Sequence, residues 1–273
     1  MTLPSEDDTS GPARSLLAGQ SVVITGAGSG IGQATAYACA SEGALLMLGD
    51  IDADSVAETA SAIVQAGGQA AHCTGDVALS ATHKSLSETC RAQYGKVSGW
   101  VNNAAWSGGG MLADLPEKDW ERIQAVTLGS VFHGCQAAIG QMSQTGGGAI
   151  VNVSSGAGLA AEPGLAAYGA AKAGILSLTR NAAVEYARLG IRVNCVSPGP
   201  IDTPGLSGWI NEFPGGRPGF ETQIPQGRLG RPEEIAQSIV FLLSHRASYI
   251  NGTNLVVDGG IHARLASPRP SLD

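Results

Sequence analysis

The stretch SVVITGAGSGIGQATAYACASEG, residues 21–43, decides the fold of this chain. It begins with an apolar run, passes through the glycines Gly26, Gly28, Gly30 and Gly32, and continues into a helix-like run. A strand that turns directly into a helix presents unpaired N–H groups at the positive end of the helix dipole, and glycines let that backbone approach a pyrophosphate. Glycine also serves tight turns and helix–strand packing, so the turn alone favours nucleotide binding without establishing it.

Short β-branched runs alternate with longer amphipathic runs along the rest of the chain. The expected strands are residues 21–25, 44–50, 69–76, 98–104, 148–155, 191–199 and 253–260. The clearest helical run, residues 168–190, ends at Gly190, and glycine is common where helices end. Apolar strands that alternate with helices predict a single-domain, doubly wound α/β fold, in which a seven-stranded parallel sheet has helices on both faces.

The domain is expected to occupy residues 17–261. Residues 1–16 and 262–273 are rich in proline, serine and charge, so we expect a flexible N-terminal extension and a C-terminal tail. Within the domain, residues 204–226 combine several Gly and Pro with apolar side chains, a composition typical of a mobile lid over a substrate. Packing of the same aromatic side chains on the body of the domain is the alternative.

The composition excludes several classes of protein. The 273 residues carry a formal net charge of −7, so the chain can bury a large core but offers no basic face to nucleic acid. No apolar run reaches membrane-spanning length, and the N-terminus is acidic and polar, unlike a secretory signal. We expect a cytoplasmic protein with no nucleic-acid or membrane partner.

The cysteines and histidines indicate neither a disulfide framework nor a metal centre. Five cysteines without C-x-x-C spacing are typical of small buried side chains in a reducing compartment. The five histidines are scattered and never paired at ligand spacing, so we expect no metal. The cysteines are Cys39, Cys73, Cys90, Cys135 and Cys195.

Two spacings carry the prediction further. The glycine turn has the form T-G-x-x-x-G-x-G, and the segment VNVSSGAGLAAEPGLAAYGAAKAG has the form S-x12-Y-x3-K. Together they resemble the short-chain dehydrogenase/reductase family, and further segments extend the resemblance over most of the chain. The residues that carry it are Thr25, Gly26, Gly30, Gly32, Ser155, Tyr168 and Lys172. The resemblance implies a Rossmann-type fold that binds a nicotinamide cofactor and exchanges a hydride with an alcohol or ketone.

Tyr168 and Lys172 are four residues apart and therefore share one face of a helix. Alcohol oxidation needs a base for the hydroxyl proton, and an ordinary Tyr, with a pKa near ~10, is a poor one at neutral pH. A lysine ammonium and the positive nicotinamide both favour the phenolate. The predicted roles are general acid/base for Tyr168, pKa tuning and ribose binding for Lys172, and substrate-oxygen binding for Ser155.

Asp50 follows the second expected strand, about twenty residues after the glycine turn, where an acidic group can accept hydrogen bonds from the adenosine ribose. Its charge would repel a 2′-phosphate, so Asp50 favours NAD over NADP. Ser29 and Ile51 stand where NADP-preferring family members commonly carry a basic residue. The alternative is that Asp50 merely caps the helix that begins near Asp52.

The resemblance also implies the remaining cofactor contacts. Asp76 and Val77 match the pair that contacts adenine, and Ile201 and Thr203 match the residues that hold the carboxamide. Ala105 stands where the family's N-N-A-G segment has glycine. The predicted cofactor-binding residues are Gly26, Gly28, Ser29, Gly30, Ile31, Gly32, Asp50, Ile51, Asp76, Val77, Asn103, Ala104, Ala105, Tyr168, Lys172, Pro198, Gly199, Ile201 and Thr203.

One catalytic position departs from the family pattern. The family has an asparagine seven residues after a tryptophan, and counting from Trp120 leads to Thr127. That asparagine helps to hold a helix irregularity and a water through which the lysine exchanges protons with solvent. Thr127 therefore puts the proton relay in question and leaves cofactor binding untouched.

Apolar side chains from the expected lid and from neighbouring loops predict an apolar substrate pocket. They are Trp106, Met111, Leu159, Ala160, Leu206, Trp209 and Phe213. The prediction is an NAD-dependent dehydrogenase of an alicyclic, terpenoid or steroid-like secondary alcohol. The alternatives are a 3-oxoacyl carrier-protein reductase and a non-catalytic NAD-binding protein. The resemblance also implies a homotetramer in which helices around 117–144 and 167–189 pair across an interface.

Overall fold

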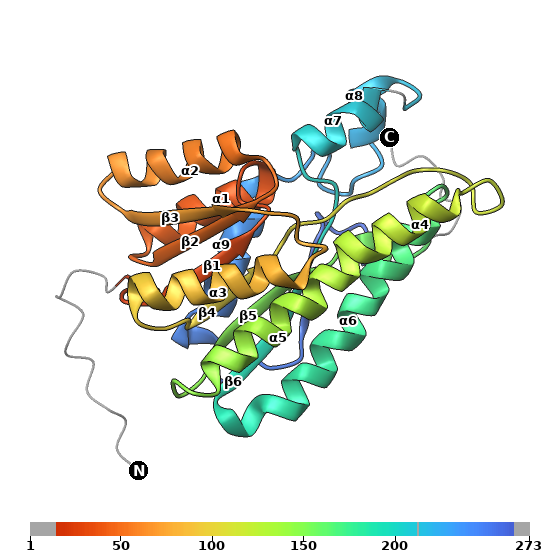
Figure 1. The fold of residues 1–273 in the computed structure, drawn as a ribbon. Coiled ribbons are helices and arrows are strands. Elements are labelled where there is room, and N and C mark those ends of the chain that lie inside the picture. Colours follow the sequence, from red (N-terminus) through yellow and green to blue (C-terminus); the bar gives the residue numbers. More distant parts are fainter. Residues whose placement is uncertain (1–14, 212, 265–273) are drawn as a thin grey trace, which may run out of the picture.

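A single parallel sheet organises the part of the chain that the computed structural model describes, residues 15–211 and 213–264 (Figure 1). Its seven strands lie in the order β3-β2-β1-β4-β5-β6-β7, and every neighbouring pair is parallel. The strands are β1 (Ser21–Thr25), β2 (Leu45–Asp50), β3 (Gln69–Thr74), β4 (Gly99–Asn102), β5 (Gly148–Val153), β6 (Ile191–Pro198) and β7 (Asn254–Val257). The predicted doubly wound sheet is confirmed.

Helices cover both faces of the sheet (Figure 1). The helices α1 (Gly30–Ser41), α2 (Ala53–Gln65) and α9 (Pro232–Leu243) pack into one buried apolar cluster on one face. On the other face, α3 (Ser80–Tyr94), α5 (Ser130–Met142) and α6 (Ala166–Tyr186) pack into a second cluster. Burial on both faces explains why the central strands are continuously apolar.

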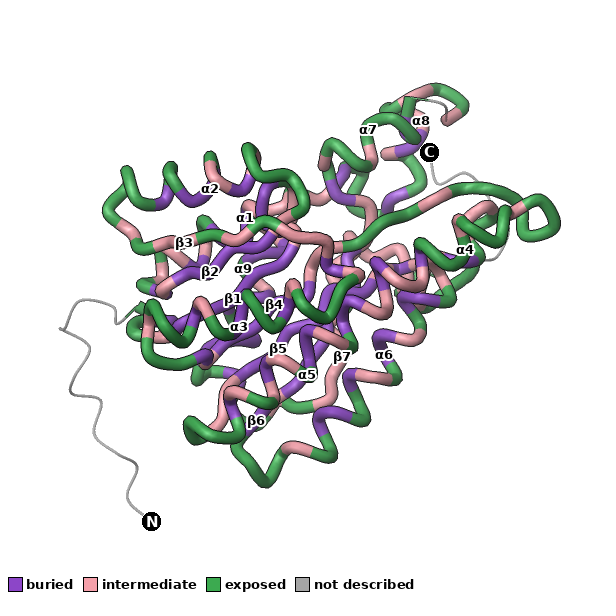
Figure 2. Tube along the Cα trace, viewed as in Figure 1, coloured by how far each residue is buried: buried purple, intermediate pink, exposed green. Residues whose placement is uncertain are grey.

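Strand β1 shows how the sequence serves both layers. Val22 and Ile24 point into the cluster beneath α1 and α9, whereas Val23 points into the cluster beneath α3, α5 and α6. All five residues of β1 are buried, while the edge strand β3 is partly exposed along its length (Figure 2). The alternation of side chains across the sheet therefore requires an apolar residue at every central position.

The chain reverses its direction of winding between β1 and β4, which are neighbours in the sheet although β2 and β3 lie between them in sequence. In open parallel sheets, such a reversal opens a crevice outside the carboxyl ends of the strands, and ligands bind there. Because all strands are parallel, the glycine turn after β1 and the segments after β2, β4, β5 and β6 all leave from this edge. The candidate site residues come from these segments.

The helix expected around residues 117–144 is interrupted. It consists of α4 (Glu117–Ile123), a π-helical segment at Gln124–Gly129 and α5. Thr127 lies in the π-helical segment and is fully buried. π-helical turns are rare, and they occur frequently at functional sites.

Residues 204–226 form a substructure of their own above the carboxyl edge of the sheet (Figure 1). They contain two short helices, α7 (Pro204–Asn211) and α8 (Gly216–Glu221). Ile210 and Phe220 are buried in a small apolar cluster, and the ring of Phe220 meets those of Trp209 and Phe213 edge-on at 5.3 and 5.2 Å between centroids. The lid aromatics therefore pack mainly against one another, and Ile261 joins them from the C-terminal segment.

The ends of the domain are anchored near the predicted boundaries. Leu16 N–H donates to Glu42 Oε2 over 2.7 Å, and Leu17 is fully buried. At the other end, His262 is hydrogen-bonded into the body of the protein. The rest of the predicted extensions, residues 1–14 and 265–273, lies outside the described residues. Within the described chain, no helix is both long enough and apolar enough to cross a membrane.

Candidate active site

The glycine turn joins β1 to α1 and leaves the start of the helix open. Ser29 is the N-cap residue but its side chain makes no capping bond, and the first turn of α1 holds no acidic side chain. Gly32 is required by close approach, because an added Cβ would overlap the carbonyl oxygen of Gly26. The first-turn N–H groups therefore face the crevice at the positive end of the helix dipole, an arrangement that fits a phosphate group.

The segment after β4 holds the glycine turn in place. Asn103 Nδ2 donates to the carbonyl oxygens of Thr25 (3.0 Å) and Gly26 (3.1 Å). The Thr25 hydroxyl in return accepts from the N–H groups of Asn103 (3.1 Å) and Ala104 (3.3 Å). Asn103 is thus placed as a support of the turn. Ala105, which stands where the resemblance implies glycine, is exposed.

Asp50 faces the same turn from the end of β2. Its Oδ2 accepts from Gly28 N–H at 2.8 Å, and its Oδ1 accepts from Asp52 N–H at 3.1 Å. The N-cap of α2 is Asp52, which accepts from the N–H groups of Asp54 and Ser55. Asp50 is therefore not the helix cap, and the alternative explanation for it is wrong.

Asp76 has an additional partner that the sequence did not indicate. Its Oδ1 accepts from Ala78 N–H at 2.9 Å, and its Oδ2 pairs with the Arg122 guanidinium at 2.9 Å. Burial opposes ionisation of Asp76, but these two contacts outweigh it and hold the pKa of the carboxyl below its usual range. Arg122 comes from α4, far along the chain, and no local spacing links it to Asp76. The neighbouring Val77 is buried.

The Ser-Tyr-Lys residues come together where β5 meets α6. Lys172 is almost fully buried, its Nζ donates to Val153 O at 2.7 Å, and it lies 5.4 Å from the centroid of the Tyr168 ring. Ser155 lies two residues beyond β5, and its Oγ accepts from Ala157 N–H at 3.2 Å. The Ser154 hydroxyl donates to Lys172 O at 2.8 Å, which ties the end of β5 to α6.

Burial sets the protonation of both groups in the ligand-free protein. It raises the pKa of Tyr168 to about 12, although a hydrogen bond with Ser155 lowers it in part. It lowers the pKa of Lys172 to about 8, against a smaller raising effect of Cys195. The environment therefore opposes the charged form of both groups, and Tyr168 as a neutral phenol can donate a proton. The two causes of the Tyr168 shift are its desolvation and the Ser155 hydrogen bond.

Thr127 contacts the loop after β4. Its hydroxyl donates to Trp106 O at 2.8 Å and accepts from Trp106 N–H at 3.1 Å. The residue in the position of the family asparagine therefore pins this loop onto the π-helical segment. Its hydroxyl proton is already committed to a backbone carbonyl.

The segment after β6 reaches the glycine turn. Gly199 N–H donates to Val257 O at 3.0 Å, and Ile201 is buried and bridged to Gly230. Thr203 lies over the turn, because a Cβ added to Gly30 would be 3.3 Å from Thr203 Cγ2. The start of the lid and the start of α1 are thus adjacent in space. Pro198, the last residue of β6, is paired with Val257 in the sheet.

The comparisons with known proteins agree with this geometry. A family model described as enoyl-(acyl carrier protein) reductase matches residues 26–262. The chain is 40% identical to cis-4-hydroxycyclohexanecarboxylate dehydrogenase of Sinomonas cyclohexanicum, over 88% of this chain and 96% of that protein. This chain belongs to the short-chain dehydrogenase/reductase family. It is also 37% identical to a 3-oxoacyl-[acyl-carrier-protein] reductase of Thermotoga maritima, over 90% and 98% of the two chains.

Among solved structures, this short-chain dehydrogenase/reductase is similar to levodione reductase, with a TM-score of 0.87 and 32% identity over 91% of this chain and 100% of that one. The family relationship makes the protein an oxidoreductase acting on CH–OH groups, with a nicotinamide cofactor. Its own residues fit such a cofactor, because the start of α1 is uncapped and Asp50 stands beside it.

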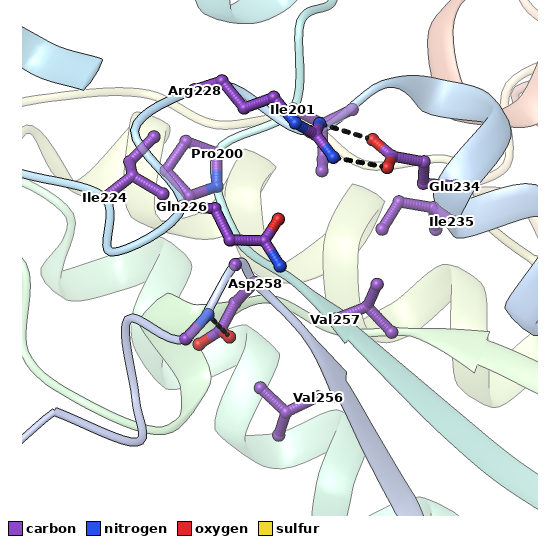
Figure 3. Close-up of a pocket in the computed structure, with 13 residues that line it drawn as sticks. Pro200, Ile201, Ile224, Gln226, Arg228, Glu234, Ile235, Val256, Val257 and Asp258 are labelled. Atoms are coloured by element: carbon purple, nitrogen blue, oxygen red, sulfur yellow. Dashed lines mark hydrogen bonds and ion pairs between the residues drawn. The ribbon is translucent and has the colours of Figure 1, made fainter. Parts of the chain in front are cut away.

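The predicted substrate residues of this dehydrogenase/reductase lie around the crevice and are unevenly exposed. Trp106, Met111, Leu159 and Trp209 are exposed, whereas Leu206 and Phe213 are partly buried in the lid cluster. A pocket of about 310 Å³ lies elsewhere, beyond the carboxyl ends of β6 and β7, and none of these residues lines it. Figure 3 shows this pocket between Ile224 and Gln226, the Arg228–Glu234 ion pair and Asp258.

The lid is tied to the segment after β6 by charges. Arg217 on α8 pairs with Asp202 at 2.7 Å and with Glu221 at 2.9 Å. Arg217 is therefore engaged within the protein. All five cysteines are free thiols, and the described residues contain no group of three or more His, Cys, Asp or Glu that could hold a metal ion.

Proposed function

We propose that this oxidoreductase is an NAD-dependent dehydrogenase of apolar secondary alcohols, which also acts in reverse as a ketone reductase. The observation that carries the proposal is the grouping of Ser155, Tyr168 and Lys172 at the carboxyl end of β5, in the sheet edge that also carries the glycine turn. One edge thus offers a phosphate-binding turn and a proton donor. Hydride transfer to or from an alcohol needs both.

The chain's own residues supply the proton chemistry. When bound, NAD would supply the acceptor for the hydride of the alcohol carbon, and its reduced form would supply the hydride for a ketone. In reduction, Tyr168 gives a proton to the ketone oxygen, and its desolvation favours the neutral phenol that this step needs. In oxidation, Tyr168 takes the alcohol proton. The Ser155 hydroxyl bonds the substrate oxygen and steadies the charge that develops on it. Lys172 binds the nicotinamide ribose and keeps an ammonium near Tyr168.

The preference for NAD rests on Asp50. A carboxylate already held beside the glycine turn accepts hydrogen bonds from the two ribose hydroxyls. A 2′-phosphate at the same place would bring like charges together, and neither Ser29 nor Ile51 offers a compensating cation. Discrimination of at least an order of magnitude, about 1.4 kcal/mol or more, is expected.

The substrate class rests on apolar residues and on one relative. Trp106, Leu159 and Trp209 expose apolar surface from the loops and lid that border the crevice. The name of the Sinomonas relative describes a secondary alcohol on a cyclohexane ring. An alicyclic, terpenoid or steroid-like secondary alcohol suits such surroundings better than a strongly charged substrate.

Two alternative functions are each supported by one observation. The Thermotoga relative supports a 3-oxoacyl carrier-protein reductase, which Asp50 and the absence of a basic residue at position 29 oppose. A non-catalytic NAD-binding protein is suggested by Thr127 in place of asparagine, and the complete Ser-Tyr-Lys set opposes it.

The test is to incubate the purified protein with NAD or NADP and a panel of secondary alcohols, and to follow formation of the reduced nicotinamide. Cyclic alcohols should be oxidised with NAD. A 3-oxoacyl thioester supplied with reduced cofactor is the comparison substrate, and preferential reduction of it with NADPH would favour the second candidate. Tight NAD binding without oxidation of any alcohol would favour the third.

The assembly expected for this protein is a homotetramer in the cytoplasm. Large apolar side chains stand exposed on α5, α6 and α9 and in or near β7, where helix-to-helix and strand-to-strand contacts between copies would cover them. They are Phe132, Val184, Phe241, Tyr249 and Val256. Sedimentation that finds a monomer at micromolar concentration would contradict the tetramer.

A further inference from the structure

The chain returns to the catalytic serine after its last strand. Residues 258–262 follow β7, and Asp258 organises them by accepting three hydrogen bonds. Its Oδ1 accepts from Gly260 N–H at 2.9 Å, and its Oδ2 accepts from both the N–H and the Nδ1 of His262 at 2.8 Å. The imidazole ring is thereby fixed in one orientation.

The other nitrogen of His262 reaches the residue next to Ser155. His262 Nε2 donates to Gly156 O at 3.1 Å, across 106 positions of sequence. Both ring nitrogens thus face oxygen atoms, one of a carboxylate and one of a carbonyl. Only about a fifth of the His262 side chain is exposed, and this shields its contacts from water.

Two glycines make room for this arrangement. A Cβ added to Gly156 would lie 2.6 Å from His262 Cε1, and one added to Gly199 would lie 2.7 Å from Asp258 Cα. Real Cβ atoms do not approach other atoms so closely. Residues 258–262 are therefore seated against the serine loop and against the segment after β6, with no space between.

The carbonyl of Gly156 joins the serine to predicted substrate contacts. Besides the His262 ring, it accepts from the N–H groups of Leu159 (2.9 Å) and Ala160 (3.1 Å). Leu159 and Ala160 are two of the predicted pocket residues, and Ser155 immediately precedes this carbonyl in the chain. A shift of Gly156 O would therefore move the serine hydroxyl and the pocket wall together.

The same segment also touches the lid. Ile261 packs in the lid cluster with Ile210, Phe220 and Ile224. Gly259 lies against Ile224, as an added Cβ would be 3.1 Å from its Cγ2, and Figure 3 shows that Asp258 and Ile224 both line the pocket described above. Adjacent residues, Ile261 and His262, thus contact the lid and the serine loop.

We propose that His262 is a positioning residue that holds Gly156 O, and with it the Ser155 hydroxyl and the loop 157–160, in the arrangement the reaction needs. Asp258 orients the ring. Ile261 connects residues 258–262, which we call the latch, to the lid. This role rests on the proposed dehydrogenase function. Nothing in the glycine spacing or in the S-x12-Y-x3-K spacing indicates it.

Two amide variants separate the two bonds of the ring. A glutamine amide nitrogen can take the place of Nε2, so His262→Gln keeps a hydrogen-bond donor for Gly156 O. The shorter His262→Asn keeps a donor near Asp258 but loses the hydrogen bond to Gly156 O. We expect His262→Gln to retain turnover within about twofold. His262→Asn should lower kcat about tenfold, the value of one hydrogen bond, and leave the KM for NAD unchanged.

Hydrogen exchange gives a readout that needs no activity. In the cofactor-free protein, His262→Asn should speed exchange of the amides of residues 157–160, while His262→Gln should leave them protected as in the parent protein. If the parent protein oxidises no alcohol, the proposed function fails, and this measurement still decides the role of His262. Equal exchange and equal kcat in the two variants would overturn the proposal.

A variant on the other side of the contact guards against misfolding of His262→Asn. Gly156→Ala places a methyl group against His262 Cε1 and should displace the ring without altering it. Its effects on kcat and exchange should match those of His262→Asn, and the double variant should be no worse than either single one, because both remove the same bond. If the effects of the two substitutions on kcat were additive, or if Gly156→Ala kept the kcat of the parent protein, the proposed role of His262 would be wrong.

Discussion

At the glycine-turn end of the crevice the chain satisfies its own polar groups, whereas the other end holds the buried Lys172 and the partly buried Tyr168, whose protonation depends on what binds. Asp50 accepts from Gly28 N–H, and Asn103 supports the carbonyls of Thr25 and Gly26. Tyr168 and Lys172 instead have pKa values displaced by burial, to about 12 and about 8. The first region is preorganised for binding, and the second awaits a charge partner.

The two ends of the crevice should depend differently on a bound cofactor. Desolvation makes the Tyr168 phenol harder to ionise than a free tyrosine, and a positive nicotinamide nearby would favour the phenolate. Reduction of a ketone starts from the neutral phenol and does not meet this obstacle. Cofactor binding and acid–base chemistry should therefore respond to different substitutions.

The largest expected effect is that of Tyr168→Phe. Turnover should fall by roughly 10² to 10⁴, the usual value of positioned acid–base catalysis, because the proton donor is gone. NAD affinity should change little, since the glycine turn and Asp50 are untouched. Steady-state kinetics and NAD titration measure the two. Tyr249→Phe, at a fully exposed tyrosine, is the matched control and should alter neither. A parallel loss of NAD binding in Tyr168→Phe would erase the distinction between the two regions.

Burial of Lys172 should appear in the pH dependence of stability. Its pKa falls from an ordinary value of 10.5 to about 8, so between these values the unfolded chain binds the extra proton. The free energy of unfolding of the parent protein should therefore rise with pH relative to Lys172→Met, by up to about 1.4 kcal/mol per pH unit. Urea unfolding of the two proteins without cofactor, from pH 7 to 10, measures the difference. Parallel curves would mean that the lysine is not desolvated.

Lys172→Met should also weaken NAD binding and lower turnover together, unlike Tyr168→Phe, because the ammonium serves the ribose and the proton chemistry.

Asp50→Ala tests the nucleotide end. The parent protein should favour NAD over NADP by at least about tenfold in kcat/KM, and the variant should lose most of that preference as the repelling charge disappears. Asp52→Ala is the control: it removes the cap of α2 and about 1 kcal/mol of stability but keeps Asp50 in place. Equal kcat/KM for both cofactors in the parent protein would end the argument from Asp50.

The smallest effect is expected at Thr127, which lies between the two regions. Its hydroxyl already bonds both backbone groups of Trp106, so restoring the family asparagine should change turnover by less than about threefold, under 1 kcal/mol. Thr127→Ser, which keeps the hydroxyl, is the control. A larger gain in Thr127→Asn would show that the side chain had limited the proton relay.

Much of the fold could be predicted because its signals are local. The apolar strand runs, the glycine turn and the glycine at position 190 each indicate their structure within a few residues, although α6 ends at Tyr186 and a 3-10 turn precedes Gly190. The parallel pairing of the strands followed from their alternation with helices. The last strand was predicted too long, at 253–260, because Asp258 bends the chain into a turn through Gly259 and Gly260, both with positive φ. The interruption of the helix at Gln124–Gly129 left no pattern in the sequence beyond the position of Thr127.

The sequence by itself determined the parallel sheet, the position of the glycine turn and the spacing that puts Tyr168 and Lys172 on one helix face, because each depends on neighbouring residues and on the periods of strand and helix. Only the tertiary structure decided the partners Arg122 for Asp76, Trp106 for Thr127 and His262 for Gly156. The tertiary structure also determines the pKa values of Tyr168 and Lys172, because the desolvation of a side chain depends on how the layers pack. Such contacts join residues tens of positions apart, and no local preference of the chain encodes which of them will meet.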